Sequence, residues 1–380
     1  MRKKLLTGFA GLLVLVNLVI VVSGKTYLYK AVWYNFADID DYKIFDNSTV
    51  KANAPVEWPN AADYNQAKLT DTLEAVHQRL ESVAFLIIKN DSVKYEQYWD
   101  GYSSSSLSNS FSMAKTIVGI LVGIAIDQGK IRSLDQQVGD FLPEFNSPEN
   151  KHLTLRHLLI MSSGLNWDES YSNPLSTTTE AYYGQDLYSL VSDLQVVNPP
   201  GKVFEYMSGN TELLALVLIK VTGKSLSEYA SEVLWTPLNA VHPALWSTDK
   251  EGGHEKAYCC FNSNARDFAR IGSLFLNKGR WNGKQVVSES YVEESVKPAP
   301  TIYSDGTPNS CYGYHWWLVN AKGRDIFYAR GILGQYIFVI PDEQMVVVRL
   351  GHKRGERTED KHLTDVYDYI EGAMEMMKIN

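Results

Sequence analysis

The chain has 380 residues, of which 45% are hydrophobic and 12% aromatic. A chain of this size and composition can bury a large core in one large or two moderate domains, which excludes a disordered protein. The formal net charge of -8 leaves no basic surplus to attract a phosphate backbone. No nucleic-acid partner is therefore expected.

The N-terminal residues have the order that is typical of an exported protein. Arg2, Lys3 and Lys4 precede an apolar run over residues 5–22. Both cleaved signal peptides and uncleaved membrane anchors have this order, and we keep both interpretations for residues 1–24. Either one predicts an extracytoplasmic protein, periplasmic or secreted, which contacts the membrane through residues 5–22 if the segment is not cleaved.

The first third of the chain then changes from an aperiodic to a periodic pattern. Aromatic, Asp and Asn residues without a period are followed by helical spacing, by two runs of β-forming residues around an Asn90-Asp91 turn, and by a long apolar stretch. The elements expected here are a linker or arm over residues 25–62, a helix over 66–80, strands over 84–89 and 93–99, and a helix over 112–129.

The rest of the chain is helical first and β-forming afterwards. We expect mostly helix and loop over about residues 130–283, and strands return near residues 312–319, 336–340 and 345–351, before a last helix over 362–377. Strands at both ends around a helical middle predict an α/β (α+β) fold. One antiparallel sheet would be built from N- and C-terminal strands, flanked by helices, with a mainly helical insertion, all within a domain over residues 63–380.

The three cysteines do not make a disulfide framework in a chain of this length. Cys259 and Cys260 are adjacent and Cys311 is remote, so we expect at most one bridge, from Cys311 to Cys259 or Cys260, and favour buried thiols. Neither the cysteines nor the eight histidines have a spacing that suits a metal. No metal and no other cofactor is expected.

The stretch "NSFSMAKTIVGILVGIAIDQGK" places two reactive side chains at the start of an apolar helix. Ser112 and Lys115 are three residues apart, which puts both on one side of the first helical turn. Burial beside the apolar residues 117–126 lowers the pKa of a lysine, and a neutral amine can take the proton of a serine hydroxyl. The pattern therefore predicts a nucleophile and its general base.

The Ser-x-x-Lys spacing alone is weak, because two more copies begin at Ser48 and Ser247 in polar, aperiodic stretches. Only the Ser112 copy stands before an apolar helix. The structural alternative is that Ser112 merely caps this helix, while Lys115 extends its amine to solvent.

Several further stretches occur in a characteristic order. They include "FSMAKTIVGILVGIAIDQGKI", "LTLRHLLIMSSGLNWDE", "PPGKVFEYMSGNTELLALVLIKVTGKSL", "YGYHWWL" and "GILGQYIFVIPDEQMVVV". Over about residues 69–351 the chain resembles the serine β-lactamase-like superfamily. It looks most similar to the class C β-lactamase and esterase branch, and especially to 6-aminohexanoate-dimer hydrolases.

The resemblance implies a role for each matching residue. Ser112 would be the acylated nucleophile and Lys115 its general base. Tyr206 would relay protons between the nucleophile, the leaving group and the hydrolytic water. Ser208 stands where the same motif usually has Asn, and it keeps a hydrogen-bonding group.

The resemblance also implies where a substrate would bind. Gly331 matches the glycine of the third motif, and the backbone NH of Ile332 would pair with that of Ser112 as an oxyanion hole. Tyr171, in "WDESY", would border the substrate cleft. Arg330 stands beside Gly331 and would supply a displaced contact to a substrate carboxylate.

The third motif departs from the pattern of penicillin-recognising relatives, which usually carry Lys-Thr-Gly or His-Thr-Gly. The aligned residues here are Ala329, Arg330 and Gly331, so the cation and hydroxyl that hold a β-lactam carboxylate are missing from their usual places. We expect an exported serine hydrolase that acts on a small amide or ester. The alternatives are a penicillin-binding DD-peptidase or β-lactamase, and a non-catalytic membrane-anchored binding module.

Overall fold

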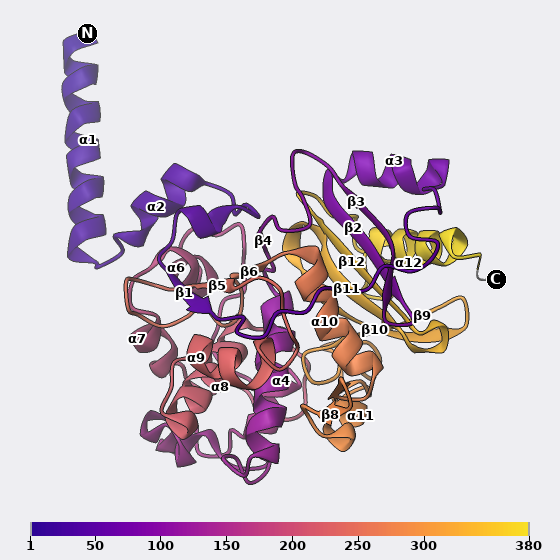
Figure 1. The fold of residues 1–380 in the computed structure, drawn as a ribbon. Coiled ribbons are helices and arrows are strands. Elements are labelled where there is room, and N and C mark those ends of the chain that lie inside the picture. The colour runs from indigo at the N-terminus through magenta and orange to yellow at the C-terminus, as the bar shows by residue number, and fades with distance from the viewer. Residues whose placement is uncertain (1, 379–380) are drawn as a thin grey trace.

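The computed structural model describes residues 2–378, and side chains from residue 11 onward. A lobe built on a large β-sheet lies beside a mainly helical lobe, and α4 (Met113–Asp127) and α10 (Ala265–Leu276) lie between them (Figure 1). Helix α1 (Arg2–Val22) projects away from both lobes at the N-terminus.

The large sheet has six antiparallel strands in the order β3-β2-β12-β11-β10-β9. The strands are β2 (Ser82–Lys89), β3 (Ser92–Tyr98), β9 (Trp317–Ala321), β10 (Arg324–Gly331), β11 (Gln335–Ile340) and β12 (Met345–Gly351). Because β2 pairs with β12, the sheet joins N-terminal to C-terminal strands, which confirms the predicted fold class. Strand β10 has no clear period-2 pattern, and the sequence analysis did not predict it.

Helices cover both faces of this sheet. α3 (Asp71–Arg79) and α12 (Thr364–Met376) pack on one face, whereas α4 and α10 pack on the other. α10 approaches β12 so closely that a Cβ at Gly272 would lie 2.6 Å from Cγ1 of Val346. Only glycine fits at this contact.

The helical lobe also contains a small antiparallel sheet in the order β1-β5-β6-β4, which the sequence analysis did not predict. Its strands are β1 (Asn47–Val50), β4 (Ser108–Asn109), β5 (Ala244–Ser247) and β6 (Phe261–Ser263). The remaining elements are α5 (Leu155–Leu159), α6 (Thr177–Tyr183), α7 (Leu187–Ser192), α8 (Ser208–Thr222), α9 (Leu226–Ala230), α11 (Glu289–Ser295) and the hairpin of β7 (Arg280–Trp281) and β8 (Lys284–Gln285).

The segment expected to be a linker or arm, residues 25–62, is folded onto the body. α2 (Tyr27–Tyr34) packs against α6, and β1 pairs with β5. Trp58 is 7% exposed, and its Nε1 donates a hydrogen bond to the carbonyl of Arg266. The aromatic residues that suggested an aperiodic linker are thus partly core residues.

Asn17 is the one polar side chain in the described part of α1. The large apolar residues between Leu12 and Val22 are 46–78% exposed, except Ile20, which is half-buried. Residues 5–10 of the predicted signal or anchor lie outside the described side chains. Among the side chains that are described, no helix is long and apolar enough to cross a membrane.

The cysteine prediction is wrong for the adjacent pair and confirmed for Cys311, which was expected to be a buried thiol. Cys259 and Cys260 form a disulfide with each other, and Cys311 is a free, buried thiol. The bridge to Cys311 that the sequence left possible does not form, because Cys311 packs in the core on the α12 side of the sheet, whereas the adjacent pair belongs to the core around α4.

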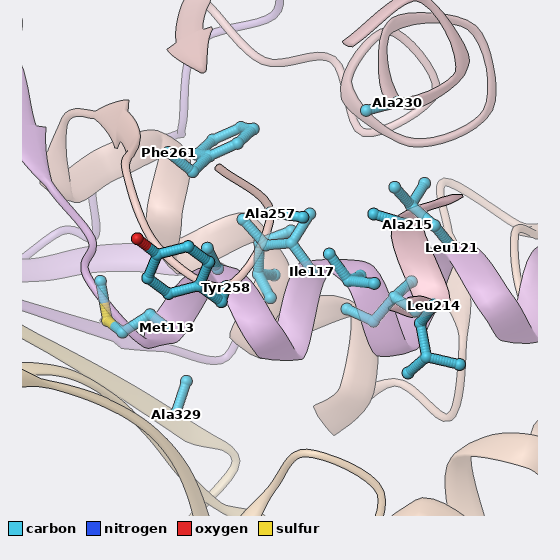
Figure 2. Packing of buried hydrophobic residues seen from close by; sticks show 14 of the residues in the cluster. Met113, Ile117, Leu121, Leu214, Ala215, Ala230, Ala257, Tyr258, Phe261 and Ala329 are labelled. Atoms are coloured by element: carbon cyan, nitrogen blue, oxygen red, sulfur yellow. The ribbon is translucent and has the colours of Figure 1, made fainter. Parts of the chain in front are cut away.

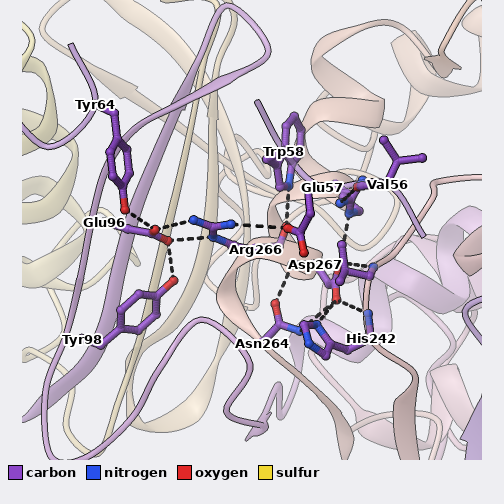
Figure 3. Close-up of polar contacts among 12 residues, drawn as sticks. Val56, Glu57, Trp58, Tyr64, Glu96, Tyr98, His242, Asn264, Arg266 and Asp267 are labelled. Carbon is purple, nitrogen blue, oxygen red and sulfur yellow. Dashed lines mark hydrogen bonds and ion pairs between the residues drawn. The ribbon is translucent and has the colours of Figure 1, made fainter. Parts of the chain in front are cut away.

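A buried carboxylate on β3 ties the strand to α10 (Figure 3). Glu96 accepts hydrogen bonds from Arg266 at 2.9 Å and from Tyr64 and Tyr98, both at 2.6 Å. Burial alone would raise the pKa of Glu96, but these hydrogen bonds outweigh it and hold the pKa below its ordinary value. Glu57 also faces Arg266, at 3.5 Å, but its side chain is 67% exposed.

Substituting Glu96→Gln is expected to lower the free energy of unfolding by about 3 kcal/mol at pH 7, since it leaves Arg266 without its buried counter-charge. The pKa of Glu96 is lower in the folded than in the unfolded state, so the stabilisation is present above the unfolded pKa and is lost as the pH falls through the folded one. The difference in the free energy of unfolding between wild type and Glu96→Gln should therefore become smaller at acidic pH. Urea denaturation at neutral and acidic pH measures it.

The matched control is Glu57→Gln, which removes the exposed partner of the same arginine and should change stability little. Equal losses in the two variants would contradict the role of burial at Glu96.

Candidate active site

Ser112 is the first residue before α4 and is half-buried. Its side chain makes no capping hydrogen bond to the helix. Instead, its Oγ lies 3.2 Å from Nζ of Lys115, within hydrogen-bond distance. Phe111, the residue before it, has a φ of 43°, which is unusual for a bulky side chain, and Oδ1 of Asn109 accepts its N–H at 2.9 Å. A constrained turn thus presents the hydroxyl at the start of the helix.

Helix α4 is buried around its whole circumference, as expected for a helix that is apolar on all sides. Its residues Met113, Ile117 and Leu121 pack against α8, the 257–261 segment and β10 (Figure 2). Lys115 lies within this core and is 1% exposed. Its amine therefore does not extend to solvent, which excludes the alternative in which Ser112 only caps the helix and Lys115 is solvated.

Burial is the main influence on the charge of Lys115. Loss of solvation lowers the pKa of the ammonium to about 8, although the carboxylates of Glu169 and Glu212 act in the opposite direction. With a pKa of about 8, about a tenth of the amine is uncharged at pH 7, and this neutral form can act as a general base.

Nζ of Lys115 has three polar partners within hydrogen-bond distance. They are Oγ of Ser112 at 3.2 Å, Oγ of Ser208 at 3.1 Å and the carbonyl oxygen of Tyr258 at 2.9 Å. A neutral amine has two N–H groups and one lone pair. The carbonyl of Tyr258 can only accept a hydrogen bond, so one N–H must point to it.

Glu169 settles the direction of the second N–H. One of its oxygens accepts the hydroxyl of Ser208 at 2.8 Å, and the other accepts the backbone N–H of Ser208 at 2.7 Å. Because the hydrogen of Ser208 points to this carboxylate, its oxygen is left to accept from Lys115. Ser112 is then the one partner with a hydrogen to give, so the lone pair of the neutral amine faces the nucleophile.

Tyr206 stands on the other side of Ser112 and is half-buried. Its ring packs on Trp317 and Tyr312, with centroids 5.7 and 6.0 Å away, and Nζ of Lys115 is 5.1 Å from its centroid. Burial raises the pKa of the phenol above its ordinary value, and a hydrogen bond with Ser112 partly offsets this. The phenol therefore keeps its proton at neutral pH and is suited to donate it.

The third motif meets the nucleophile turn at the end of β10. A Cβ at Gly331 would lie 2.2 Å from the carbonyl oxygen of Ser110, so only glycine allows this approach. It brings the N–H of Ile332 close to the turn that carries Ser112. In the turns and loops that the structure describes, the backbone N–H groups of Ser112 and Ile332 make no backbone hydrogen bond. The pair is therefore free to act as an oxyanion hole.

The two remaining predicted residues border the same region. Tyr171 is 55% exposed and donates a 2.6 Å hydrogen bond to Glu169. The guanidinium of Arg330 stacks on the ring of Trp317 at 3.4 Å, and its buried Nη1 has no hydrogen-bond partner in the described structure. A buried donor without a partner is costly, so this side of the site is suited to an acceptor group of a ligand.

The structure brings together every residue that the sequence analysis placed in the site. It also separates the other Ser-x-x-Lys copies, because Ser48 and Ser247 lie on the paired strands β1 and β5 rather than on helices. Sequence reasoning missed Glu169 and the carbonyl of Tyr258. Glu169 lies two residues before Tyr171 in a stretch already singled out, but a backbone carbonyl leaves no signal in the sequence.

Comparisons with known proteins find relatives that cover most of the chain. A 6-aminohexanoate-dimer hydrolase of Paenarthrobacter ureafaciens is 28% identical over 302 residues, which cover 74% of this chain and 76% of that protein. A Bacillus anthracis structure, provisionally assigned as a 6-aminohexanoate-dimer hydrolase, superposes with a TM-score of 0.79 at 25% identity, covering 90% and 94% of the two chains.

A family VIII carboxylesterase structure has the same fold, with a TM-score of 0.65 at 17% identity and coverage of 84% of this chain and 99% of that one. The sequence model of the Beta-lactamase family matches residues 65–369, which is most of the chain. The chain therefore belongs to the Beta-lactamase family.

Proposed function

We propose that this protein is an exported serine hydrolase that cleaves an amide or ester bond through an acyl-enzyme on Ser112. The observation that carries the proposal is the arrangement around Lys115. Its buried amine has two fixed acceptors, Ser208 and the carbonyl of Tyr258, and a third partner, Ser112, that can give it a proton.

Acylation begins when the neutral amine of Lys115 takes the proton of Ser112. Oγ attacks the substrate carbonyl, whose oxygen is held by the N–H groups of Ser112 and Ile332. The bond to the leaving group breaks as Tyr206 donates its proton to the departing amine or alcohol. The proton on Lys115 then restores the phenol of Tyr206.

Deacylation repeats these roles with water as the nucleophile. Lys115 and Tyr206 remove a proton from the water, which attacks the acyl carbonyl in the same oxyanion hole. The acid product leaves and Ser112 regains its hydrogen, so the site returns to its starting state without any cofactor.

The named relatives support a small amide or ester substrate, since they include a dimer hydrolase and a carboxylesterase. The third motif supports it too. Ala329 stands where penicillin-recognising relatives carry a cation, and the nearest guanidinium, Arg330, is stacked on Trp317. A substrate that relies less on a fixed carboxylate contact suits this arrangement better than a β-lactam.

Export and membrane contact belong to the same proposal. The basic residues before the apolar run support export, and the exposed apolar surface of α1 continues into α2. Val32, Trp33 and Phe36 are 77%, 82% and 80% exposed. They are the three most exposed large apolar side chains described outside α1. Aromatic residues next to an apolar segment are typical of the membrane–water interface.

Substituting Ser112→Ala is expected to lower the hydrolysis of p-nitrophenyl esters at least about a thousandfold, since the acyl-enzyme cannot form. A fluorophosphonate probe should label wild type at Ser112 and leave the variant unlabelled, as read by mass spectrometry. Ser48→Ala, in another Ser-x-x-Lys copy, is the matched control and should keep full activity.

Two results would contradict this assignment. Full esterase activity in Ser112→Ala would exclude Ser112 as the nucleophile. Stable labelling of Ser112 by a fluorescent penicillin, without ester or amide turnover, would favour a penicillin-binding enzyme instead.

Substituting Glu169→Gln should move the acid limb of the kcat/KM profile to lower pH. In wild type we expect this limb near pH 8, where Lys115 loses its proton, and the Glu169 carboxylate holds the pKa of Lys115 up. kcat should also fall about tenfold, because the hydroxyl of Ser208 loses its charged acceptor. Initial rates from pH 5 to 10 measure both effects.

Asp168→Asn is the matched control for Glu169→Gln. It removes an exposed carboxylate from the same loop, and its hydrogen bonds stay within that loop. An unchanged acid limb in Glu169→Gln, or an equal shift in Asp168→Asn, would remove Glu169 from the proposed mechanism.

Phospholipid vesicles test the membrane contact. The full chain should co-sediment with vesicles of mixed neutral and anionic lipids, and a chain of residues 25–380 should bind them at least tenfold more weakly. Trp33→Ser with Phe36→Ser should weaken the residual binding further, since the two side chains remove apolar area from water. Equal binding of all three proteins would contradict the proposed anchor.

A further inference from the structure

The loop between β5 and β6 carries the disulfide and the carbonyl that binds Lys115. Tyr258, whose oxygen accepts Nζ at 2.9 Å, directly precedes the bridged residues Cys259 and Cys260. The two cysteines are 4% and 0% exposed. Cys260 has a φ of 66°, in a region that residues other than glycine rarely adopt.

Hydrogen bonds hold this loop on both sides of Tyr258. The N–H of Ala257 donates to a carboxylate oxygen of Glu212 at 2.9 Å. Nε1 of Trp246 donates to the carbonyls of Lys256 and Cys259, both at 3.1 Å. The carbonyl of Tyr258 takes no part in these hydrogen bonds and accepts from Lys115 instead.

A bridge between adjacent cysteines closes a ring that contains the peptide bond joining them. The ring leaves little torsional freedom at Cys259 and Cys260, so the backbone that follows Tyr258 is restricted to essentially one conformation. Without the ring, Cys260 is an ordinary residue at positive φ, and its backbone would relax toward negative φ. Such a relaxation turns the preceding peptide groups.

We propose that the Cys259–Cys260 disulfide is a positioning device for catalysis, which holds the Tyr258 carbonyl against Nζ of Lys115 and thereby directs the lone pair of the amine to Ser112. This inference rests on the proposed function, in which Lys115 is the general base. Figure 2 shows Tyr258 beside Met113, the first residue of α4.

The position of the Tyr258 carbonyl predicts whether its displacement changes kcat or KM. Tyr258 is 3% exposed and lies behind Lys115, so its carbonyl does not reach a bound substrate. If it turns away, the amine keeps only Ser208 as a fixed acceptor and can rotate its lone pair away from Ser112. Proton transfer then slows, whereas substrate binding is preserved, so kcat falls and KM does not change.

The pH profile gives a second, independent sign. The carbonyl accepts more strongly from the ammonium than from the amine, so its loss disfavours the protonated form. The other titratable groups that face Lys115 are Glu169, Glu212, Tyr206, the Tyr258 phenol and His315. Glu169, Tyr206 and His315 lie outside the loop. The acid limb of kcat should therefore move to lower pH.

The experiment compares wild type with Cys259→Ser/Cys260→Ser. The expected result is a fall in kcat of about tenfold, KM within twofold of wild type, and an acid limb displaced to lower pH. Cys311→Ser, which removes a buried sulfur without breaking a bridge, is the matched control and should leave the acid limb in place. A double variant with the kcat and acid limb of wild type would overturn the proposal.

A single variant covers the case in which the double serine variant does not fold. Cys260→Gly breaks the bridge but gives the positive φ its preferred residue. It should fold, as judged by circular dichroism, and still show the lower kcat and the displaced limb, because glycine without the ring adopts several backbone conformations and no longer fixes the Tyr258 carbonyl. Wild-type kinetics in folded Cys260→Gly would show that φ alone positions the carbonyl and would overturn the role of the disulfide.

Alkylation tests the bridge itself. Denatured wild type should take up one iodoacetamide adduct, on Cys311, and three after reduction with dithiothreitol, which transfers two electrons and two protons to the bridge. Three adducts without reduction would overturn the proposal. Loss of activity in Ser112→Ala together with unaltered kinetics in both cysteine variants would reject this inference alone, whereas full activity in Ser112→Ala would reject the proposed function as well.

Discussion

The structure of the site depends on an apolar core that lowers the pKa of one amine and on polar contacts that fix the direction of its lone pair. An ammonium is costly to bury, and a neutral amine much less so. α4 supplies the apolar surroundings of Lys115, and the loop after β5 supplies the carbonyl of Tyr258. The start of α8 supplies the hydroxyl of Ser208. α4 thus excludes water from the amine, and the two acceptors orient it toward Ser112.

Burial and nearby charge oppose each other at this amine, and the balance sets the chemistry. Glu169 and Glu212 favour the ammonium, whereas desolvation favours the amine, and together they leave the pKa of Lys115 at about 8. Desolvation has the opposite consequence for Tyr206, whose pKa it raises. One environment thus produces a group that accepts a proton and a neighbour that holds one, which separates the base from the acid.

The sequence alone predicted what depends on local spacing. Ser112 and Lys115 follow from a helical pattern, and the large sheet follows from strand patterns at the two ends of the chain. Tyr206 and Ile332 came only from the resemblance, because no local pattern distinguishes a catalytic tyrosine or a backbone N–H. Strand β10 was missed because it has no clear period-2 pattern, and the small sheet because its strands come from segments far apart in the sequence. The disulfide was missed because the analysis considered a bridge only to Cys311 and not between the adjacent cysteines.

The missed elements are connected to one another. β1, within the segment expected to be a linker, pairs with β5, and β5 leads into the loop that binds Lys115. The N-terminal arm therefore supports the position of Lys115, the proposed general base, through one strand pairing. The same loop contains the disulfide, and disulfides persist mainly in oxidising compartments outside the cytoplasm. The geometry of the base and the proposed export of the chain are thus linked, because the bridge that directs the amine is stable where the N-terminal segment would send the protein.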